Sequence, residues 1–372
     1  MASIALIAVV IGVFAYLQAV VESAVRVLAR SADPNAIVIL SPGALSETVS
    51  NLQKDQINRL ETIPQLVRDA DGPIISNEIV ALSSAVPREG GDVTVNAAVR
   101  GVDLARANRV RHGRVHIMPG GRAFRPGASE IIVGAAVHHL HRNHDPGDEV
   151  VLGTRASTAF RIVGVFDTGG TAADSEIWGD VERFRETYGR TGYSAARVLV
   201  PDGNAAWQAI QMAQGPSVGL SAQTESDYFR RLGTNQRPTF VLSIAIVIIL
   251  GIAAALAVAN TMYASVAART GEIAMLRTMG FVRSSILAAF VLEGLALAAL
   301  GGALGVLLSC LWYGTQQKMV SGMLTVVSYR LAITAPIAAT CLAVGAGIGL
   351  AGTLLPAWRA SRVDVVTALR EM

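Results

Sequence analysis

The sequence has 372 residues, of which 52% are hydrophobic and 16% charged, and its mean hydropathy is +0.45. Because globular domains carry roughly 25% charged residues, this composition excludes an ordinary soluble protein and favours a membrane protein with room for one or two soluble domains. The formal charge of +3 does not indicate nucleic-acid binding, since the sequence has no stripe of basic residues interleaved with aromatic residues.

Four stretches have the length and the lack of charge that are typical of transmembrane helices. They are residues 4–21, 240–259, 286–312 and 331–355. The first stretch lacks the basic n-region of a signal peptide and is long for an apolar h-region, so we expect it to be retained as a helix. The two cysteines, Cys310 and Cys341, lie in the last two stretches and are expected to act as small apolar residues.

The short loops predict the orientation of these helices, because cytoplasmic loops carry an excess of arginine and lysine. The loop between the third and fourth stretches has only Lys318 and Arg330. We therefore expect three parts to be cytoplasmic: the loop between the second and third stretches, the tail after the fourth stretch, and the N-terminus. The long segment from about residue 22 to 237 is then expected to lie outside. The arginines that support this orientation are Arg269, Arg277, Arg283, Arg359, Arg362 and Arg370.

The outer segment contains strand-like runs and helical patterns, which together favour an α+β domain. Strands are predicted at residues 36–40, 94–102, 130–137, 148–153, 160–166 and 195–200, and helices at 44–60, 178–189, 204–214 and 221–238. The predicted fold is an α-helical membrane protein with four transmembrane helices and a large extracytoplasmic α+β domain inserted between the first two. We expect a first helix with its extension (1–28), an outer domain (29–236) and a part with three helices (237–372).

Sequence patterns for catalysis are absent. A phosphate-binding P-loop needs G-x-x-x-x-G-K-[ST], but the sequence has only two lysines, Lys54 and Lys318, and each follows a glutamine. The patterns G-x-S-x-G and H-E-x-x-H are also missing. We therefore expect no enzyme activity and no cofactor in this chain, and any ATP that it uses to be hydrolysed by another chain.

A cluster of histidines could indicate a metal site. It consists of His138, His139, His141 and His144. No carboxylate completes a recognised ligand spacing around them, and a short surface helix followed by a turn explains the segment. We therefore predict no metal site, and stoichiometrically bound zinc would be the sign of the alternative, a metalloenzyme.

Three residues of the third apolar stretch are candidates for packing or gating within the membrane. Glu293 is an acid inside a predicted span, which makes it a functional candidate, and we favour packing or gating over proton transfer. Gly301 and Gly305 form a G-x-x-x-G pattern, which Gly345 and Gly349 repeat in the fourth stretch. Small residues at this spacing let helices approach closely, so they support a packed bundle or a dimer.

The stretch "RTGEIAMLRTMG", residues 269–280, predicts a short amphipathic helix on the cytoplasmic face. Glu272 lies near its start, where the helix dipole favours an acid, and Arg277 lies near its end. Ile273 and Leu276 follow the i,i+3 spacing, with methionines beside them. An ordinary loop would explain the arginines, but it would not explain the acid or the apolar stripe, which suit insertion into the groove of a partner.

The pattern R-x-x-E-I-x-x-L-R-x-x-G in this stretch resembles the signature of the MacB/FtsX-like ABC transporter permeases. Residues 356–370 are similar to the family tail P-A-x-R-A-x-x-x-x-P-x-x-A-L-R, with Val365 in place of its second proline. Residues 131–153 and 160–182 resemble strands of the family's periplasmic core domain. The family order of one helix, a large outer domain and three helices also matches, so the resemblance covers nearly the whole chain. The family usually has an amphipathic cytoplasmic segment before its first helix, where this sequence has three residues.

The resemblance implies that residues 269–281 are a coupling helix, followed later by a cytoplasmic tail at 357–372. Glu272 would contact a separate cytoplasmic ABC ATPase, which would bind the ATP and Mg. The coupling frame carried over with Glu272 consists of Arg269, Leu276, Arg277 and Gly280. Motion on ATP binding would then pass mechanically to the outer domain.

The family also implies a location and further partners. The chain is expected in the bacterial inner membrane as a multi-pass protein, with its large domain in the periplasm. It would pair with a second permease copy, work with a periplasmic adaptor protein, and export or extract a hydrophobic or amphipathic substrate. The alternative is a transmembrane signalling protein that regulates an envelope hydrolase and transports nothing.

Overall fold

The computed structural model describes residues 2–85, 95–140, 145–153, 158–234, 237–321 and 325–362. The chain divides into two compact units. The helical unit consists of Met1–Ser23, Arg237–Thr315 and Arg330–Met372, and the sheet unit of Ala24–Gln236 and Gln316–Tyr329. The sheet unit takes in a segment, Gln316–Tyr329, from the part of the chain that is predicted to carry the last three long helices.

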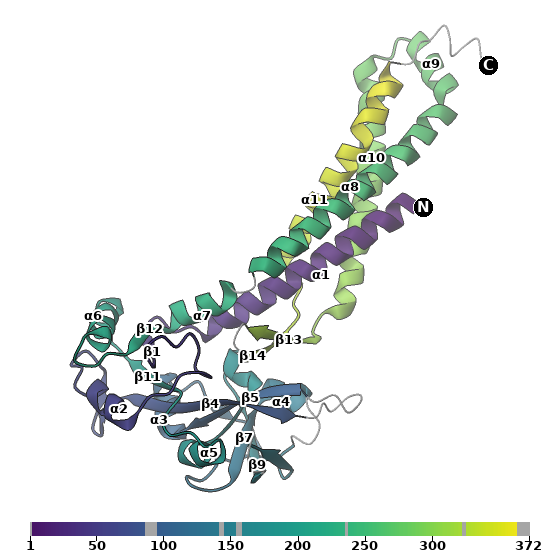
Figure 1. Ribbon diagram of the computed structural model, residues 1–372. Coiled ribbons are helices and arrows are strands. Elements are labelled where there is room, and N and C mark those ends of the chain that lie inside the picture. The colour runs from purple at the N-terminus through teal and green to yellow at the C-terminus, as the bar shows by residue number, and fades with distance from the viewer. Residues whose placement is uncertain are drawn as a thin grey trace. The chain divides into compact units, whose positions relative to one another are not determined.

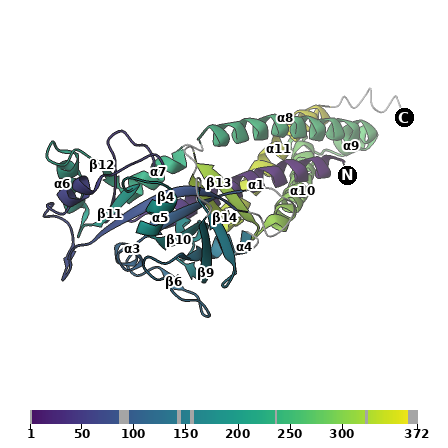
Figure 2. The same cartoon turned by 60° about the horizontal axis from the view of Figure 1, so that its bottom comes forward.

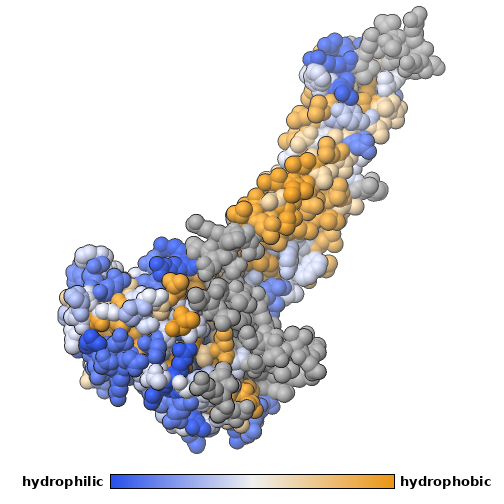
Figure 3. Space-filling view, viewed as in Figure 1, coloured by the Kyte–Doolittle hydropathy of each residue, from blue (hydrophilic) through white to orange (hydrophobic). Residues whose placement is uncertain are grey.

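The helical unit is built from long apolar helices. In the described part of the chain, four helices are long and apolar enough to cross a membrane. They are α1 (Ala2–Ser31), α8 (Arg237–Ala268), α10 (Arg283–Ser309) and α11 (Ala335–Ser361), with the short α9 (Thr270–Thr278) between α8 and α10 (Figure 1). The visible face of this unit is mostly hydrophobic along its helices (Figure 3). This surface is the one that lipid would cover in a membrane-spanning bundle.

The fourth helix begins later than predicted, at Ala335 instead of residue 331. Thr334 is its N-cap residue, and a proline occupies its first turn, where the missing N–H is no loss. Leu331 is instead part of an extended connection, since its N–H donates to the carbonyl of Thr315 at 2.9 Å and its carbonyl accepts from the N–H of Gly314 at 2.8 Å. An apolar residue before the helix therefore lengthened the predicted span.

Several glycines of this unit lie where the long helices approach one another closely. A Cβ atom at Gly305 would lie 2.6 Å from the carbonyl oxygen of Ala8, and one at Gly301 would lie 2.8 Å from the Cβ of Ile7. Both glycines thus face α1 at a distance that excludes any larger side chain. Gly349 makes a similarly close approach to α10, where its missing side chain would overlap Ala298.

The sheet unit is organised around one mixed sheet of ten described strands. Their order is β12-β1-β11-β4-β5-β10-β7-β9-β6, with β8 paired to β9. Figure 2 labels β12, β11, β4, β10, β9 and β6 of this sheet. The pairs β5–β10 and β7–β9 are parallel and the other pairs are antiparallel. The bounds are β1 (Ala36–Leu40), β4 (Ile75–Ala85), β5 (Val95–Val102), β6 (His116–Ile117), β7 (Glu130–Gly134), β8 (Glu149–Leu152), β9 (Thr158–Asp167), β10 (Glu176–Asp180), β11 (Ala195–Leu199) and β12 (Ser221–Thr224).

Short helices and hairpins complete the unit. The helices are α2 (Lys54–Leu60), α3 (Leu104–Val110), α4 (Ala135–Leu140), α5 (Val181–Thr187), α6 (Gly203–Gln214) and α7 (Glu225–Thr234), with a 3₁₀ turn at Ala172–Ser175. Two small hairpins pair β2 (Arg68–Asp69) with β3 (Gly72–Pro73), and β13 (Gln316–Ser321) with β14 (Thr325–Arg330). This mixture of strands and helices agrees with the predicted α+β character of the outer domain.

The long strand β4 joins the two halves of the sheet. Its first residues pair with β11 and its later residues, from Ile79 onwards, pair with β5. One apolar core lies on the side of β1 and β11, with Leu52 and Leu60 among its members, and another lies around β7 and β9, with Phe160 and Phe184. Strand β4 therefore makes the two cores parts of a single domain.

Several predicted elements are wrong in detail. The helix predicted at 44–60 is confined to α2, because Gln53 and Gln56 form a capping box that starts the helix only there. The helix predicted at 221–238 is preceded by strand β12, and the hydroxyl of Thr224 accepts from the N–H of Asp227 at 3.1 Å to start α7. Residues 178–180 extend β10, and residues 135–137 belong to α4 and not to a strand.

Candidate coupling surface and a buried ion network

Helix α9 occupies the predicted coupling segment. Arg269 is its N-cap residue, and Gly280 follows its end with a φ of +98°, a conformation that glycine adopts without strain. Ile273 and Ala274 are buried against the helical unit, so they fix one face of the helix. The segment is therefore a helix with defined ends and a defined inner face.

The opposite face of α9 is exposed and mostly apolar. Met275 is 53% exposed and Met279 63%, with Leu276 and Glu272 also on the surface. The exposed apolar surface continues along the chain with Phe281 and Val282. A contiguous apolar surface with a single acid is typical of a helix that inserts into the groove of a partner. We refer to Glu272, Met275, Leu276 and Met279 as the α9 outer face.

Two arginines of the predicted frame act inside the helical unit. Arg277 donates from Nη1 to the carbonyl oxygen of Ser361 at 3.1 Å, which ties α9 to the last turn of α11. Arg269 pairs with Glu293 of α10 at 3.6 Å, and both side chains are partly exposed. The structure thus brings together two residues that the sequence assigned to different roles, and it gives the acid inside the third span a cationic partner at the start of α9.

The histidine cluster provides no metal site among the described residues. His138 lies 2.7 Å from the carboxylate of Asp145, while His141 and His144 are outside the described residues. No group of three or more His, Cys, Asp or Glu side chains in the described ranges is placed to bind a metal ion.

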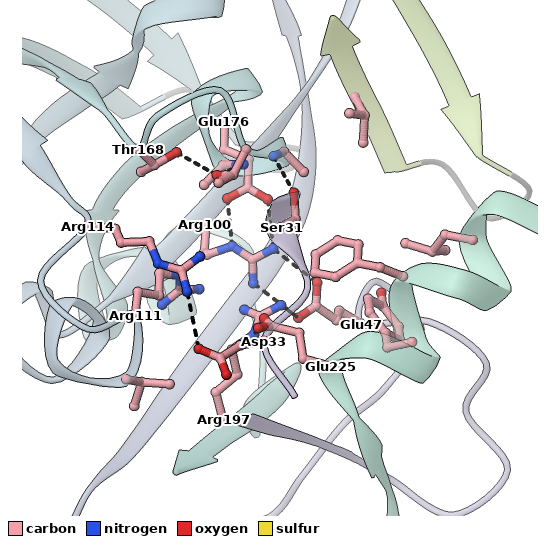
Figure 4. A pocket seen from close by; sticks show the side chains of 18 residues that line it. Ser31, Asp33, Glu47, Arg100, Arg111, Arg114, Thr168, Glu176, Arg197 and Glu225 are labelled. Carbon is pink, nitrogen blue, oxygen red and sulfur yellow. Dashed lines mark hydrogen bonds and ion pairs between the residues drawn. The ribbon is translucent and has the colours of Figure 1, made fainter. Parts of the chain in front are cut away.

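A buried network of charged side chains, which the sequence did not predict, lies in the middle of the sheet. Arg100 of β5 donates to both carboxylate oxygens of Glu176 at 2.7 Å and to both oxygens of Glu47 at 3.0 and 3.1 Å. It also donates to Glu78 of β4 at 2.5 Å. Figure 4 shows the Arg100 guanidinium between Glu176 and Glu47. All of the donor nitrogens of this arginine therefore point at carboxylates.

The second arginine of the network, Arg197, extends from β11. It lies 2.8 Å from Glu47 and 3.1 Å from Glu225 of α7, and it also pairs with Glu78. Arg111, at the end of α3, completes the network at 2.9 Å from Glu78. We call these seven side chains the ion network: Glu47, Glu78, Arg100, Arg111, Glu176, Arg197 and Glu225.

The charges of the network determine the protonation of its carboxylates. Burial raises the pKa of the Glu78 carboxyl, but Arg111, Arg197 and Arg100 more than offset this effect and hold the pKa well below its ordinary value. Glu47 likewise has a lowered pKa, because Arg100 and Arg197 outweigh its burial. For Glu225 burial dominates, so its pKa is raised in spite of Arg197 and Arg111. The network holds four carboxylates against three guanidinium groups, and Glu225 is the acid that is least well compensated.

The helical unit also contains an apolar groove of about 520 Å³. It is formed by α1, α8 and α11, and its lining is almost entirely apolar. Phe14, Leu17, Val247, Ile248, Ile252 and Ile348 are among the residues that line it. A groove of this volume is large enough for a small hydrophobic ligand.

These features define a protein with four helices long and apolar enough to cross a membrane, a large domain of strands and helices, and a short helix with an exposed apolar face between α8 and α10. Residues 2–214, more than half of the chain, match the model of the MacB-like periplasmic core domain, and residues 243–365 match that of the FtsX-like permease C-terminal domain. The chain therefore belongs to the MacB/FtsX-like family, the permease component of ABC transporters, whose members act with a cytoplasmic ABC ATPase.

Individual relatives match over shorter stretches. The chain is 32% identical over 147 residues to the macrolide export ATP-binding/permease protein MacB 1/2 of Paracoccus denitrificans, which covers 39% of this chain and 21% of the relative. It is 29% identical over 163 residues to the MacB protein of Syntrophobacter fumaroxidans, covering 43% and 21%. Among solved structures, the periplasmic region of MacB from Actinobacillus actinomycetemcomitans is 14% identical, with a TM-score of 0.37, and covers 54% of this chain and 94% of that one. The matched stretches thus span about a fifth of the length of the curated relatives.

Proposed function

We propose that the chain is a permease subunit that couples ATP hydrolysis by a separate cytoplasmic ABC ATPase to movement of its outer domain. The observation that carries this proposal is the α9 outer face, where exposed Met275, Leu276 and Met279 surround the acid Glu272. The ATP and Mg belong to the ATPase, because the sequence offers no P-loop lysine of its own. In this assignment the chain supplies the mechanical part of the transporter and needs no cofactor.

The contacts of α9 explain how its movement reaches the long helices. The Arg277–Ser361 hydrogen bond links α9 to α11, and the Arg269–Glu293 pair links it to α10. A charge pair at the edge of the membrane is stronger than one in bulk water, because the surroundings screen it less. A displacement of α9 by the ATPase therefore acts on both of these helices and not on a loose loop.

The apolar groove supports a hydrophobic or amphipathic substrate. Its walls offer aliphatic and aromatic side chains and few polar groups, so they favour an acyl chain or a similar apolar ligand over a charged one. In this proposal the chain works in the bacterial inner membrane with its sheet unit in the periplasm, as a pair of permease copies, and with a periplasmic adaptor protein. The alternative, a signalling regulator of an envelope hydrolase, is not favoured, because the family is that of transporter permeases.

The proposal is tested by reconstituting the chain with its ATPase in lipid nanodiscs and measuring ATP hydrolysis. Glu272→Lys reverses the charge of the α9 outer face, and we expect it to weaken co-purification or to uncouple the ATPase. The matched control is Glu61→Lys, which makes the same change at an exposed glutamate of the sheet unit. If no ATPase associates with the wild-type chain, or if the two variants behave alike, the coupling role of α9 is wrong.

A further inference from the structure

Three elements of the sheet unit that adjoin its connections to the helical unit line one small cavity beside the ion network. The chain passes between the units through α1, through the segment that joins α7 to α8, and at both ends of the β13–β14 hairpin. On the sheet-unit side, the end of α1, helix α7 and strand β14 line a cavity of about 50 Å³. They contribute Ser31 and Asp33 from the end of α1, Tyr228 and Phe229 from α7, and Val327 from β14.

The end of α1 is fixed by polar contacts. The hydroxyl of Ser31 accepts from the N–H of Ala172 at 2.7 Å. Asp33 lies 2.9 Å from the Nε2 of His112 and 3.3 Å from Arg114. All three partners, Ala172, His112 and Arg114, follow β5 in the sequence.

Helix α7 is held by an ion pair to the network and by buried side chains on one of its faces. Glu225, its first residue, pairs with Arg197 at 3.1 Å, so the helix is joined to β11. Tyr228, Phe229 and Leu232 are buried, and they line the cavity described above. The helix that leads towards α8 therefore begins at a buried ion pair.

The hairpin is fixed by a reciprocal pair of hydrogen bonds. The N–H of Ser328 donates to the hydroxyl of Ser175 at 2.7 Å, and that hydroxyl donates to the carbonyl of Ser328 at 3.2 Å. Val327, Ser328 and Tyr329 are all buried. Ser175 directly precedes Glu176, the bidentate partner of Arg100, so this attachment also ends at the ion network.

We propose that the ion network and these attachments form a joint that transfers movement of the membrane helices to the middle of the sheet. Four neighbouring strands, β11, β4, β5 and β10, each contribute a member through Arg197, Glu78, Arg100 and Glu176. Buried charges with several partners resist sliding, because any displacement leaves a charge unpaired in a medium of low dielectric constant. Glu225 and Ser175 are thus positioning residues for the mechanical coupling, and the inference rests on the proposed function.

The test removes one attachment at a time. Glu225→Ala frees the start of α7 and leaves three carboxylates against three guanidinium groups, so the rest of the network stays balanced. Ser175→Ala breaks the attachment of the hairpin and leaves every charge in place. The matched control is Glu130→Ala, because Glu130 accepts bidentate hydrogen bonds from Arg122 at 2.6 and 2.7 Å but lies outside the network.

The readout is hydrogen–deuterium exchange of the complete complex in nanodiscs, with and without a non-hydrolysable ATP analogue. In the wild type and in Glu130→Ala, we expect the analogue to change exchange both in α9 and in β11 and β12. In Glu225→Ala and Ser175→Ala, the change in α9 should remain while the change in the strands falls to less than about half, measured at a temperature where each variant is folded.

The outcomes separate this inference from the proposed function. If the analogue changes nothing in α9 of the wild type, the coupling role of α9 fails. If α9 responds and both variants pass the full change to β11 and β12, the coupling role stands and the joint is wrong. The Ser175 variant keeps the test decisive even if Glu225→Ala does not fold, because it alters no charge.

Discussion

Removal of Arg100 should destabilise the sheet unit more than removal of any exposed arginine. In Arg100→Met, Glu176 loses its guanidinium partner. Glu47 loses one of its two arginine partners, and Glu78 loses one of its three. Breaking a buried ion pair by removing one partner costs about 3–5 kcal/mol. For a domain of this size each kcal/mol lowers Tm by about 2–4 °C, so we expect a decrease of about 6–20 °C.

The assay is thermal unfolding of the purified chain in detergent, followed by circular dichroism. Arg122→Met is the matched control, because Arg122 is a half-exposed arginine with one carboxylate partner, Glu130. If the two variants lower Tm equally, the ion network contributes no more than a surface pair and our account of it is wrong.

The pH dependence of the same variant provides a second check, with a sign that follows from the pKa shifts. In the wild type, the lowered pKa of Glu47 means that its stabilisation is present above its ordinary pKa and is lost as the pH falls below it. In Arg100→Met that pKa is expected to rise, because one of the two arginines that lower it is gone. The difference in Tm between the variant and the wild type should therefore shrink as the pH is lowered from 7 towards about 4. A difference that grows over this range would contradict the assignment of charges.

Two further predictions concern the helical unit. Gly305→Leu should lower the free energy of unfolding of the chain in detergent by about 1–3 kcal/mol or more, because the new side chain would overlap the backbone of α1. Gly347→Leu is the control, since nothing lies within 4 Å of a Cβ at that position. Equal losses in the two variants would exclude close α1–α10 packing. Arg269→Glu and Glu293→Arg should each reduce the ATPase activity of the reconstituted complex. The double variant should recover this activity if the pair acts through its charges. A double variant no more active than the single ones would show that the pair does not position α9.

The predictable part of the fold depends on local patterns. The four long helices follow from apolar length alone, and α9 follows from an acid, an arginine and a glycine at fixed spacing. Strand β4 was missed because Glu78 interrupts its apolar pattern, and only the tertiary structure supplies the arginines that neutralise this charge. The sequence predicts packing or gating sites at Gly301 and Gly305, because glycines at this spacing let two helix backbones approach closely.

The ion network could not be predicted, because its members are spread from Glu47 to Glu225 and meet only through the order of strands in the sheet. That order places β11 beside β4 and β5 beside β10, although these strands are far apart in the sequence. A signal was nevertheless present in the sequence. Arg100 follows three apolar residues in β5 and Arg197 stands between apolar residues in β11, and a charged residue in such a position needs a buried partner.

The discontinuous composition of the sheet unit has a consequence for biosynthesis. The β13–β14 segment, Gln316–Tyr329, belongs to this unit but follows α10 in the sequence. A ribosome must therefore translate three of the four long helices before the last piece of the sheet unit exists. Until then, the Ser175 hydroxyl lacks the backbone of Ser328 as its partner, so the sheet unit completes its fold only after three of the long helices have been made.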